Sequence, residues 1–273
     1  MNELIDGAGH SELDRLAERI RQHYTNMPKK LQEIANFALV YPETMALSTL
    51  SDLEQRTSIN SSAFVRFAKY MNFAGFSQLQ AVYKQSLKSQ WSNYSARIAQ
   101  LETLSSDESF EALSGAAAQS ILTSHQQIDA DRLDNAITML RQAKMIWLVG
   151  NGRTMAALSY LSYMLTRMGV RNQTVSHAPQ FAFDQLELIG KGELIFATSF
   201  APYSELTVSL ITQARKQNID ILSITDTKIS PLYDTNSLLV VESAFQGFKS
   251  ISATISLCQH LAIETGRSKT ASR

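Results

Sequence analysis

The sequence has little of several things, and each shortage excludes a class of protein. It has a single cysteine, Cys258, which excludes an intrachain disulfide framework and a cysteine-based metal cluster. The 5 prolines and 11 glycines are too few for a collagen-like or low-complexity chain. No apolar run approaches the roughly 18 residues that span a bilayer, and the first residues do not form a secretory signal. We therefore expect a soluble, cytoplasmic protein with no membrane partner.

Acidic residues are missing from one long stretch of the chain. Between Gln55 and Leu101 there is no Asp or Glu, and this stretch holds six basic residues: Arg56, Arg66, Lys69, Lys84, Lys88 and Arg97. Because the whole chain has a net charge of zero, the remainder carries the opposite charge. A basic block in an otherwise acidic chain indicates an anionic partner, most often nucleic acid, although a solvated helix face would give the same pattern.

The first third of the chain has helical periodicity. A short helix near residue 50 and a second one with Phe64 and Phe67 on its inner face are separated by a turn over residues 56–60. Two short helices joined by a tight turn, with basic residues on the second, are typical of a helix-turn-helix that enters the DNA major groove. We predict DNA contacts from seven residues on the outer side of this arrangement: Arg56, Asn60, Ser61, Ser62, Val65, Arg66 and Lys69.

In the rest of the chain the spacing of the apolar residues changes from a helical period to short continuous runs. Short continuous apolar runs, typical of strands buried on both faces of a parallel sheet, lie at residues 145–149, 193–198, 220–225 and 238–241. Amphipathic helical segments alternate with them, which predicts a three-layer α/β domain. A last helix, from about residue 245 to 262, would place Cys258 in the core and present Phe248, Ile251 and Ile255 as an oligomer surface.

These patterns predict a multidomain fold. An all-α helix-turn-helix domain is expected over residues 1–88, a helical linker over residues 89–109, and an α/β three-layer domain with a parallel sheet over residues 110–273. A long polar helix from Ser77 to about Leu104 would join the two domains.

Residues 31–87 resemble the N-terminal domain of RpiR-type transcriptional regulators. Pro42, Ile59 and above all the stretch FVRFAKYMNFAGFSQLQ carry the resemblance. Five residues depart from the family pattern. Glu54 stands where a small residue is usual, and Ser58 where the turn often has glycine; Asn60, Ala63 and Asn72 replace a usual Ser, Thr and Gly. The resemblance implies a regulator that binds a palindromic operator in double-stranded DNA. It leaves open whether Arg66 contacts the DNA or supports the helix.

Two loops rich in hydroxyl and amide groups follow two of the expected strands, and each opens a helix. Helix N-termini, backbone N–H groups and hydroxyls bind phosphate, and the carboxyl ends of parallel strands lie at one edge of a sheet. The first loop lacks the third glycine of a dinucleotide-binding fingerprint. We predict a phosphate-binding site formed by Gly150, Asn151, Gly152, Arg153, Thr154, Ser199, Tyr203 and Ser204.

Residues 110–266 resemble a sugar isomerase (SIS) domain. The two loops carry the resemblance, together with Gly192-Glu193-Leu194, Thr225-Asp226 and Ser230-Pro231-Leu232. The second loop departs from the family's Ser-x-Ser-Gly-x-Thr, since Ala201 and Pro202 replace the middle serine and the glycine. The resemblance implies an effector that is a phosphorylated sugar or sugar acid, and control of genes of carbohydrate metabolism.

SIS domains occur in isomerases as well as in sensors, so an enzyme is an alternative. An isomerase needs a base near the sugar, and Glu205 and His177 are the candidates, although a helix-start acid and a loop histidine are more often structural. No catalytic residue, metal site or cofactor is predicted, because the five histidines form no close pair. We expect a ligand-gated regulator that is not an enzyme and acts as a homodimer or tetramer. An isomerase with a helical appendage and a regulator with a ligand-blind SIS domain stay open.

Overall fold

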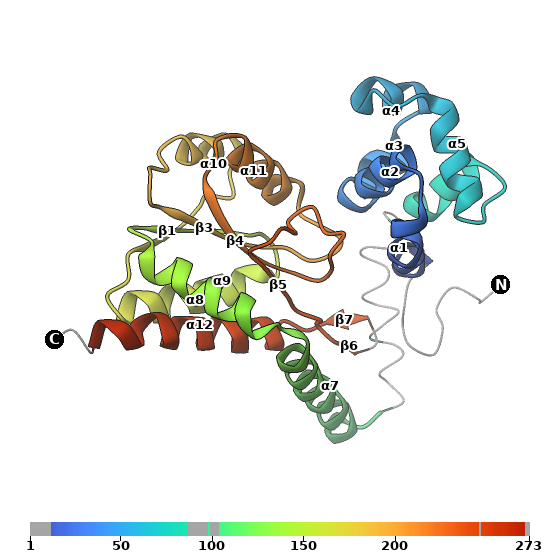
Figure 1. Ribbon diagram of the computed structural model, residues 1–273. Coiled ribbons are helices and arrows are strands. Elements are labelled where there is room, and N and C mark those ends of the chain that lie inside the picture. The colour runs from blue at the N-terminus through green and yellow to red at the C-terminus, as the bar shows by residue number, and fades with distance from the viewer. Residues whose placement is uncertain (1–11, 87–97, 99–103, 246, 271–273) are drawn as a thin grey trace. The chain divides into compact units, whose positions relative to one another are not determined.

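The computed structural model describes residues 12–86, 98, 104–245 and 247–270 (Figure 1). The chain divides into two compact units, the first running to Leu113 and also taking in residues 244–248, and the second containing the rest. Residues 77–86 of the helix expected from Ser77 to Leu104 are helical. Residues 87–97 and 99–103 of that helix, and with them most of the expected linker, lie outside the described residues.

The first unit is helical. Its elements are α1 (Glu12–His23), a 3-10 turn (Tyr24–Asn26), α2 (Lys29–Val40), α3 (Pro42–Leu47), α4 (Leu50–Thr57), α5 (Ser61–Tyr70) and a further helix at residues 76–86. The apolar faces predicted from the helical period meet in one core, where Ile20, Ile34, Leu53, Phe64 and Phe67 are fully buried. This burial holds α5 against α2 and α4, so the polar side of α5 faces outward.

Local backbone signals define the two helices of the predicted helix-turn-helix. Thr49 and Asp52 form a capping box at the start of α4, in which each side chain accepts the other's backbone N–H. The helix ends at Ser58, which takes the left-handed conformation (φ 56°) although the family often has glycine there. Asn72 after α5 is also left-handed (φ 64°), as its type predicts.

The second unit contains a parallel sheet. Its helices are α7 (Ser106–Gln127, which begins before the boundary), α8 (Ala130–Gln142), α9 (Thr154–Arg167), α10 (Pro179–Leu186), α11 (Glu205–Lys216) and α12 (Ser252–Thr270). Its strands are β1 (Ile146–Val149), β2 (Asn172–Thr174), β3 (Leu194–Thr198), β4 (Asp220–Thr225) and β5 (Ser237–Leu239), in the order β2-β1-β3-β4-β5 with every pair parallel.

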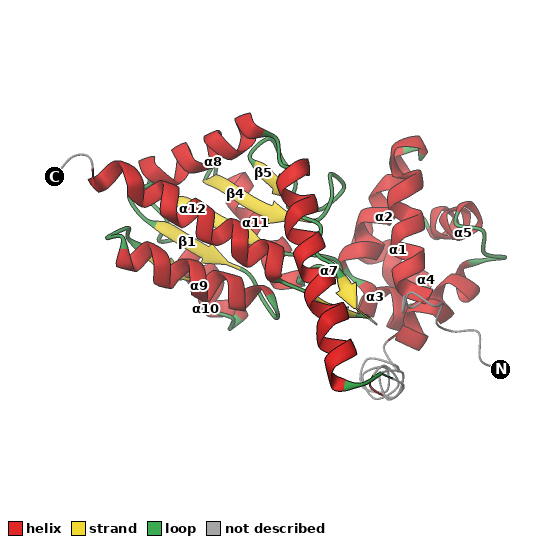
Figure 2. Ribbon diagram, turned by 90° about the horizontal axis from the view of Figure 1, so that it is seen from below, coloured by secondary structure: helices red, strands yellow, loops and turns green. Residues whose placement is uncertain are grey.

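Helices cover both faces of this sheet, as a three-layer fold requires. Helices α8, α9 and α12 lie on one face, and α10 and α11 lie on the other (Figures 1 and 2). Side chains of α8, α9 and α12 pack on strand residues such as Ile146, Phe196 and Leu222 in one apolar core. Cys258 belongs to this core, and burial raises the pKa of its thiol to about 12, so the prediction that it is a core residue is confirmed.

The structure corrects the start of the last helix. Residues expected to begin it form two short strands, β6 (Ala244–Phe245) and β7 (Phe248–Lys249), and α12 begins at Ser252. Gly247 takes a left-handed φ of 78° between the two strands, which a helix cannot accommodate. Phe248 therefore lies in a strand, while Ile251 and Ile255 are half-buried and pack against the domain's own core.

Candidate functional site

The sheet order brings the two hydroxyl-rich loops together. From β1 the chain crosses through α9 to the edge strand β2, whereas from β3 it crosses through α11 to β4 in the other direction. Neighbouring strands β1 and β3 therefore send their loops to opposite faces of the sheet, as α9 and α11 show in Figure 1. In open α/β sheets such a reversal point, at the carboxyl ends of the strands, is where ligands bind.

The loop after β1 is built tightly around Gly150. A Cβ added at Gly150 would lie 2.7 Å from Leu158 Cδ1, 2.8 Å from Thr154 Oγ1 and 3.0 Å from the Thr198 carbonyl oxygen, so a side chain does not fit. Thr154 is buried, and its hydroxyl donates to the Asn151 carbonyl at 2.9 Å and accepts the Asn151 N–H at 3.2 Å. Gly152 completes the turn with a left-handed φ of 62°. These contacts lead the chain directly into the N-terminus of α9.

The loop after β3 is organised by two serines. Ser199 is buried, and its Oγ accepts the backbone N–H of Ser204 at 3.2 Å. Ser204 is the N-cap of α11, and its Oγ accepts the N–H of Thr207 at 3.4 Å. Both hydroxyls therefore lie at the amino end of α11, where the helix dipole favours an anion.

Side chains of the two loops contact each other. The amide Nδ2 of Asn151 donates to Ser204 Oγ at 3.5 Å. The Arg153 guanidinium lies over the ring of Phe200, with its Cζ 5.6 Å from the ring centroid. The predicted residues of the two loops thus lie around one place, and Arg153 adds a positive charge beside two helix N-termini.

Two residues distant in sequence hold the second loop, and the site prediction does not include them. The carboxylate of Asp226, just after β4, accepts the Tyr203 hydroxyl at 2.7 Å and the Ala201 N–H at 3.2 Å. Lys249 Nζ donates to the Ala201 carbonyl oxygen at 2.9 Å. Tyr203 is itself buried, so the structure places its hydroxyl against Asp226. Asp226 belongs to a family motif, while no local pattern marks Lys249.

The second predicted site lies on the helix-turn-helix. Arg56 in α4, Asn60 before α5 and Ser62, Arg66 and Lys69 in α5 are exposed, while Ser61 and Val65 are half-buried. The apolar residues Phe64 and Phe67 of the same helix point into the core. Most of the predicted DNA-contacting residues therefore share the solvent side of one short helix, with two cations, Arg66 and Lys69, along it.

The candidate bases lie on the surface. Glu205 is exposed in the first turn of α11, and His177 is exposed with its Nε2 2.9 Å from Met155 Sδ. Within the described ranges, no group of three or more His, Cys, Asp or Glu side chains could hold a metal ion. None of the helices formed by the described residues has the length and hydropathy needed to cross a membrane.

Comparison with known proteins identifies both parts of the chain. Residues 14–90 match the model of the "Helix-turn-helix domain, rpiR family", and residues 139–264 match that of the "SIS domain". A relative in Haemophilus influenzae, named an uncharacterized HTH-type transcriptional regulator, is 23% identical over 232 residues, which cover 84% of this chain and 80% of the relative. The class defined by the fold and the site is thus a helix-turn-helix transcriptional regulator with a SIS domain. The chain belongs to the RpiR family of such regulators.

Solved structures share the fold. The Vibrio vulnificus NanR protein, complexed with ManNAc-6P, is 21% identical with a TM-score of 0.56, covering 94% of this chain and 93% of that one. The sugar isomerase domain of an RpiR transcription factor from Sphaerobacter thermophilus is 17% identical with a TM-score of 0.54, covering 57% of this chain and 88% of that one. These likenesses establish the architecture of the domains.

Proposed function

We propose that a phosphorylated sugar or sugar acid binds at the β1 and β3 loops and changes the affinity of this cytoplasmic regulator for a palindromic operator. The observation that carries the proposal is the meeting of the two loops at the reversal point of the sheet, with Arg153, Ser199 and Ser204 beside two helix N-termini. Hydroxyls, N–H groups and a guanidinium are the donors that a phosphate monoester accepts from.

The Haemophilus influenzae relative, which is named an HTH-type transcriptional regulator, supports a regulator over an isomerase. NanR, which has the same fold, is described as complexed with ManNAc-6P, an N-acetylated hexosamine phosphate. This likeness favours a phosphosugar effector for the present chain, together with the genes of carbohydrate metabolism as targets. Because affinity coupling is reciprocal, an effector that weakens operator binding must itself bind less tightly to the DNA-bound protein.

Selection of genomic DNA fragments by the purified protein, read by sequencing at moderate salt, tests this proposal. We expect enrichment of a two-fold site, followed by a change in its affinity with one member of a panel of hexose, N-acetylhexosamine and sugar-acid phosphates. Inorganic phosphate and the unphosphorylated sugars are the controls. Interconversion of aldose and ketose phosphates would favour the isomerase, and operator binding that no phosphosugar alters would favour the ligand-blind SIS domain.

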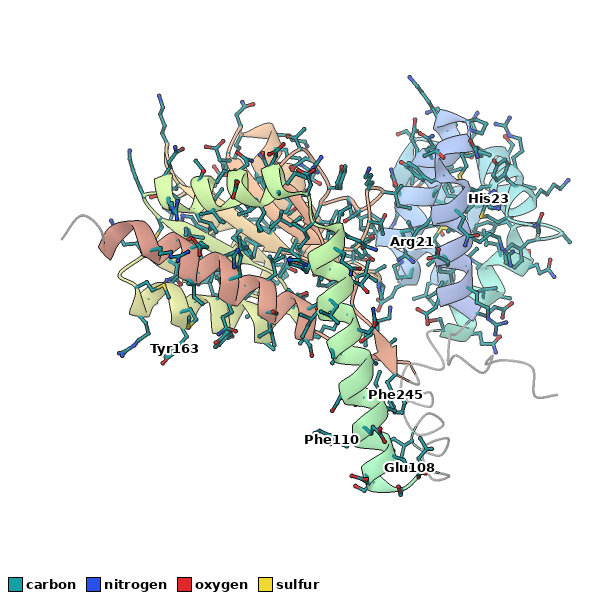
Figure 3. All side chains as sticks on the ribbon, turned by 60° about the horizontal axis from the view of Figure 1, so that its bottom comes forward. Arg21, His23, Glu108, Phe110, Tyr163 and Phe245 are labelled. Atoms are coloured by element: carbon teal, nitrogen blue, oxygen red, sulfur yellow. The ribbon has the colours of Figure 1, made fainter. Side chains whose placement is uncertain are left out.

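Helix α7 supports the homo-oligomer that a two-fold operator requires. Its buried side chains are those of Ser120 and Ser124, whereas Phe110 and Leu113 are 72% and 48% exposed. Figure 3 shows Phe110 near the free end of α7 and Tyr163 pointing outward from α9. A helix that buries serines and exposes large apolar side chains is typical of an interface between protein chains. We propose that α7, in place of α12, contributes the surface on which a second copy packs.

Replacing both Phe110 and Leu113 with Asp is expected to dissociate the oligomer. Two carboxylates in an apolar interface would lose their hydration without a partner, which costs several kcal/mol. Sedimentation velocity at micromolar protein should then show monomers in place of dimers or tetramers. The control is Ala112→Asp, which adds a charge at an exposed position of the same helix away from the face of Phe110. An unchanged sedimentation coefficient in the double variant would place the interface elsewhere.

A further inference from the structure

Glu54 connects the two helices of the helix-turn-helix. Its carboxylate oxygen Oε2, near the end of α4, accepts the backbone N–H of Ser61 at 3.0 Å, at the first residue of α5. The Ser61 hydroxyl donates to the same oxygen or to the Leu50 carbonyl oxygen, which is 3.2 Å away. Asn60, which precedes α5, makes no side-chain cap hydrogen bond. The carboxylate of α4 therefore caps α5 in place of the N-cap side chain.

This arrangement places a negative charge where DNA-binding helices often accept a phosphate. The N-terminus of a helix has unpaired N–H groups and a partial positive charge, and such ends frequently contact the DNA backbone without reading sequence. In this chain an internal carboxylate occupies the position. The hydrogen bonds from Ser61 lower the pKa of Glu54, so the group is charged throughout the pH range in which DNA binding is measured.

The side chains left free beside this cap are those that can reach base edges. Asn60 and Ser62 are exposed on either side of Ser61, and neither has a part in the cap. An amide and a hydroxyl at the start of a recognition helix form hydrogen bonds with bases in the major groove. Glu54 repels a phosphate, which weakens every placement of the protein on DNA that relies on a phosphate contact at the N-terminus of α5. Repulsion of this kind is an established source of specificity, because it disfavours the competing complexes.

We propose that Glu54 is a specificity-determining residue for DNA binding: its carboxylate occupies the N-terminus of α5, denies that position to the DNA backbone, and leaves Asn60 and Ser62 to contact bases. Two substitutions separate the charge from the hydrogen bond. Glu54→Gln keeps an oxygen that can accept the Ser61 N–H but removes the charge, whereas Glu54→Ala removes both.

The experiment measures affinities of the full-length protein, without effector, for the site selected by the wild type and for a scrambled duplex of equal length. For Glu54→Gln we expect the scrambled duplex to bind about three- to tenfold more tightly, with a log–log salt slope steeper by about one. Glu54→Ala should also loosen the placement of α5. The ratio of specific to non-specific affinity should then fall about tenfold or more, a change of about 1.4 kcal/mol.

Two control variants make the result interpretable. Lys69→Ala removes a cation from the same helix and should make the salt slope shallower by about one. Glu187→Gln removes the same charge from an exposed position directly after α10 and should change neither affinity more than about twofold. Unchanged binding of the scrambled duplex by Glu54→Gln overturns the inference, as does an equal loss for both duplexes in Glu54→Ala. Because no effector is present, neither outcome depends on the proposed phosphosugar control.

Discussion

Replacing Phe67 with alanine is expected to destabilise the helical unit, so that DNA binding is lost at a lower urea concentration than in the wild type. Phe67 is fully buried and lies on the face of α5 that packs into the core with Phe64 and Ala68. Truncation of a buried phenylalanine costs about 3–5 kcal/mol, which is a large part of the 5–15 kcal/mol that typically stabilises a domain. Urea unfolding followed by helical circular dichroism should show an early transition for this unit, with operator binding lost at the same denaturant concentration.

The matched control lies one turn along the same helix. Tyr70 is 37% exposed, so Tyr70→Ala removes an aromatic ring that contributes less to the core, and we expect a loss of about 1 kcal/mol. Because the chain has two compact units, a two-state fit to the whole chain is inappropriate, and the two transitions must be followed separately. A Phe67→Ala protein that keeps operator binding up to the urea concentration at which the wild type loses it would show that the α5 core does not support the DNA-binding surface.

The helices and buried strands that are set by the local spacing of apolar residues can be predicted from the sequence. The helical period places Phe64 and Phe67 in the core because spacings of three and four return to the same face. Continuous apolar runs give β3 and β4, since strands buried on both faces need no polar alternation. The short strand β2 is different: its residues Asn172–Thr174 have no apolar run, and only pairing with β1 makes it a strand.

Features that depend on distant residues are not predictable from local pattern. Asp226 and Lys249 reach the loop at Ala201 across 25 and 48 residues of sequence. The parallel sheet places Asp226, at the end of β4, whereas Lys249 comes from the separate pair of strands β6 and β7. The contact between Glu54 and Ser61 also depends on tertiary structure, although only seven residues separate the two. Glu54 is recognisable in the sequence as a departure from the family pattern, but its bond to Ser61 depends on the angle between α4 and α5.

Replacing Ser199 and Ser204 together with alanine is expected to eliminate the response to the phosphosugar. A hydrogen bond to a charged group contributes about 1.5–3 kcal/mol, so loss of two such bonds should weaken effector binding at least about a hundredfold. The helix cap lost with Ser204 costs about 1 kcal/mol, which the SIS domain should tolerate. Calorimetric titration with the effector identified from the panel of sugar phosphates, and operator binding in its presence, measure the two consequences.

The control for this pair is Thr212→Ala. Thr212 is also in α11, and its hydroxyl bonds to the Val208 carbonyl oxygen of its own helix, so its removal alters neither loop. With this variant the effector should shift operator affinity as in the wild type. If the double serine variant keeps the same shift, the phosphosugar binds elsewhere, and the meeting of the two loops at the reversal point serves only to pack the domain. If it binds its operator normally but ignores the effector, the β1 and β3 loops are the sensor, and the helix-turn-helix can bind DNA without them.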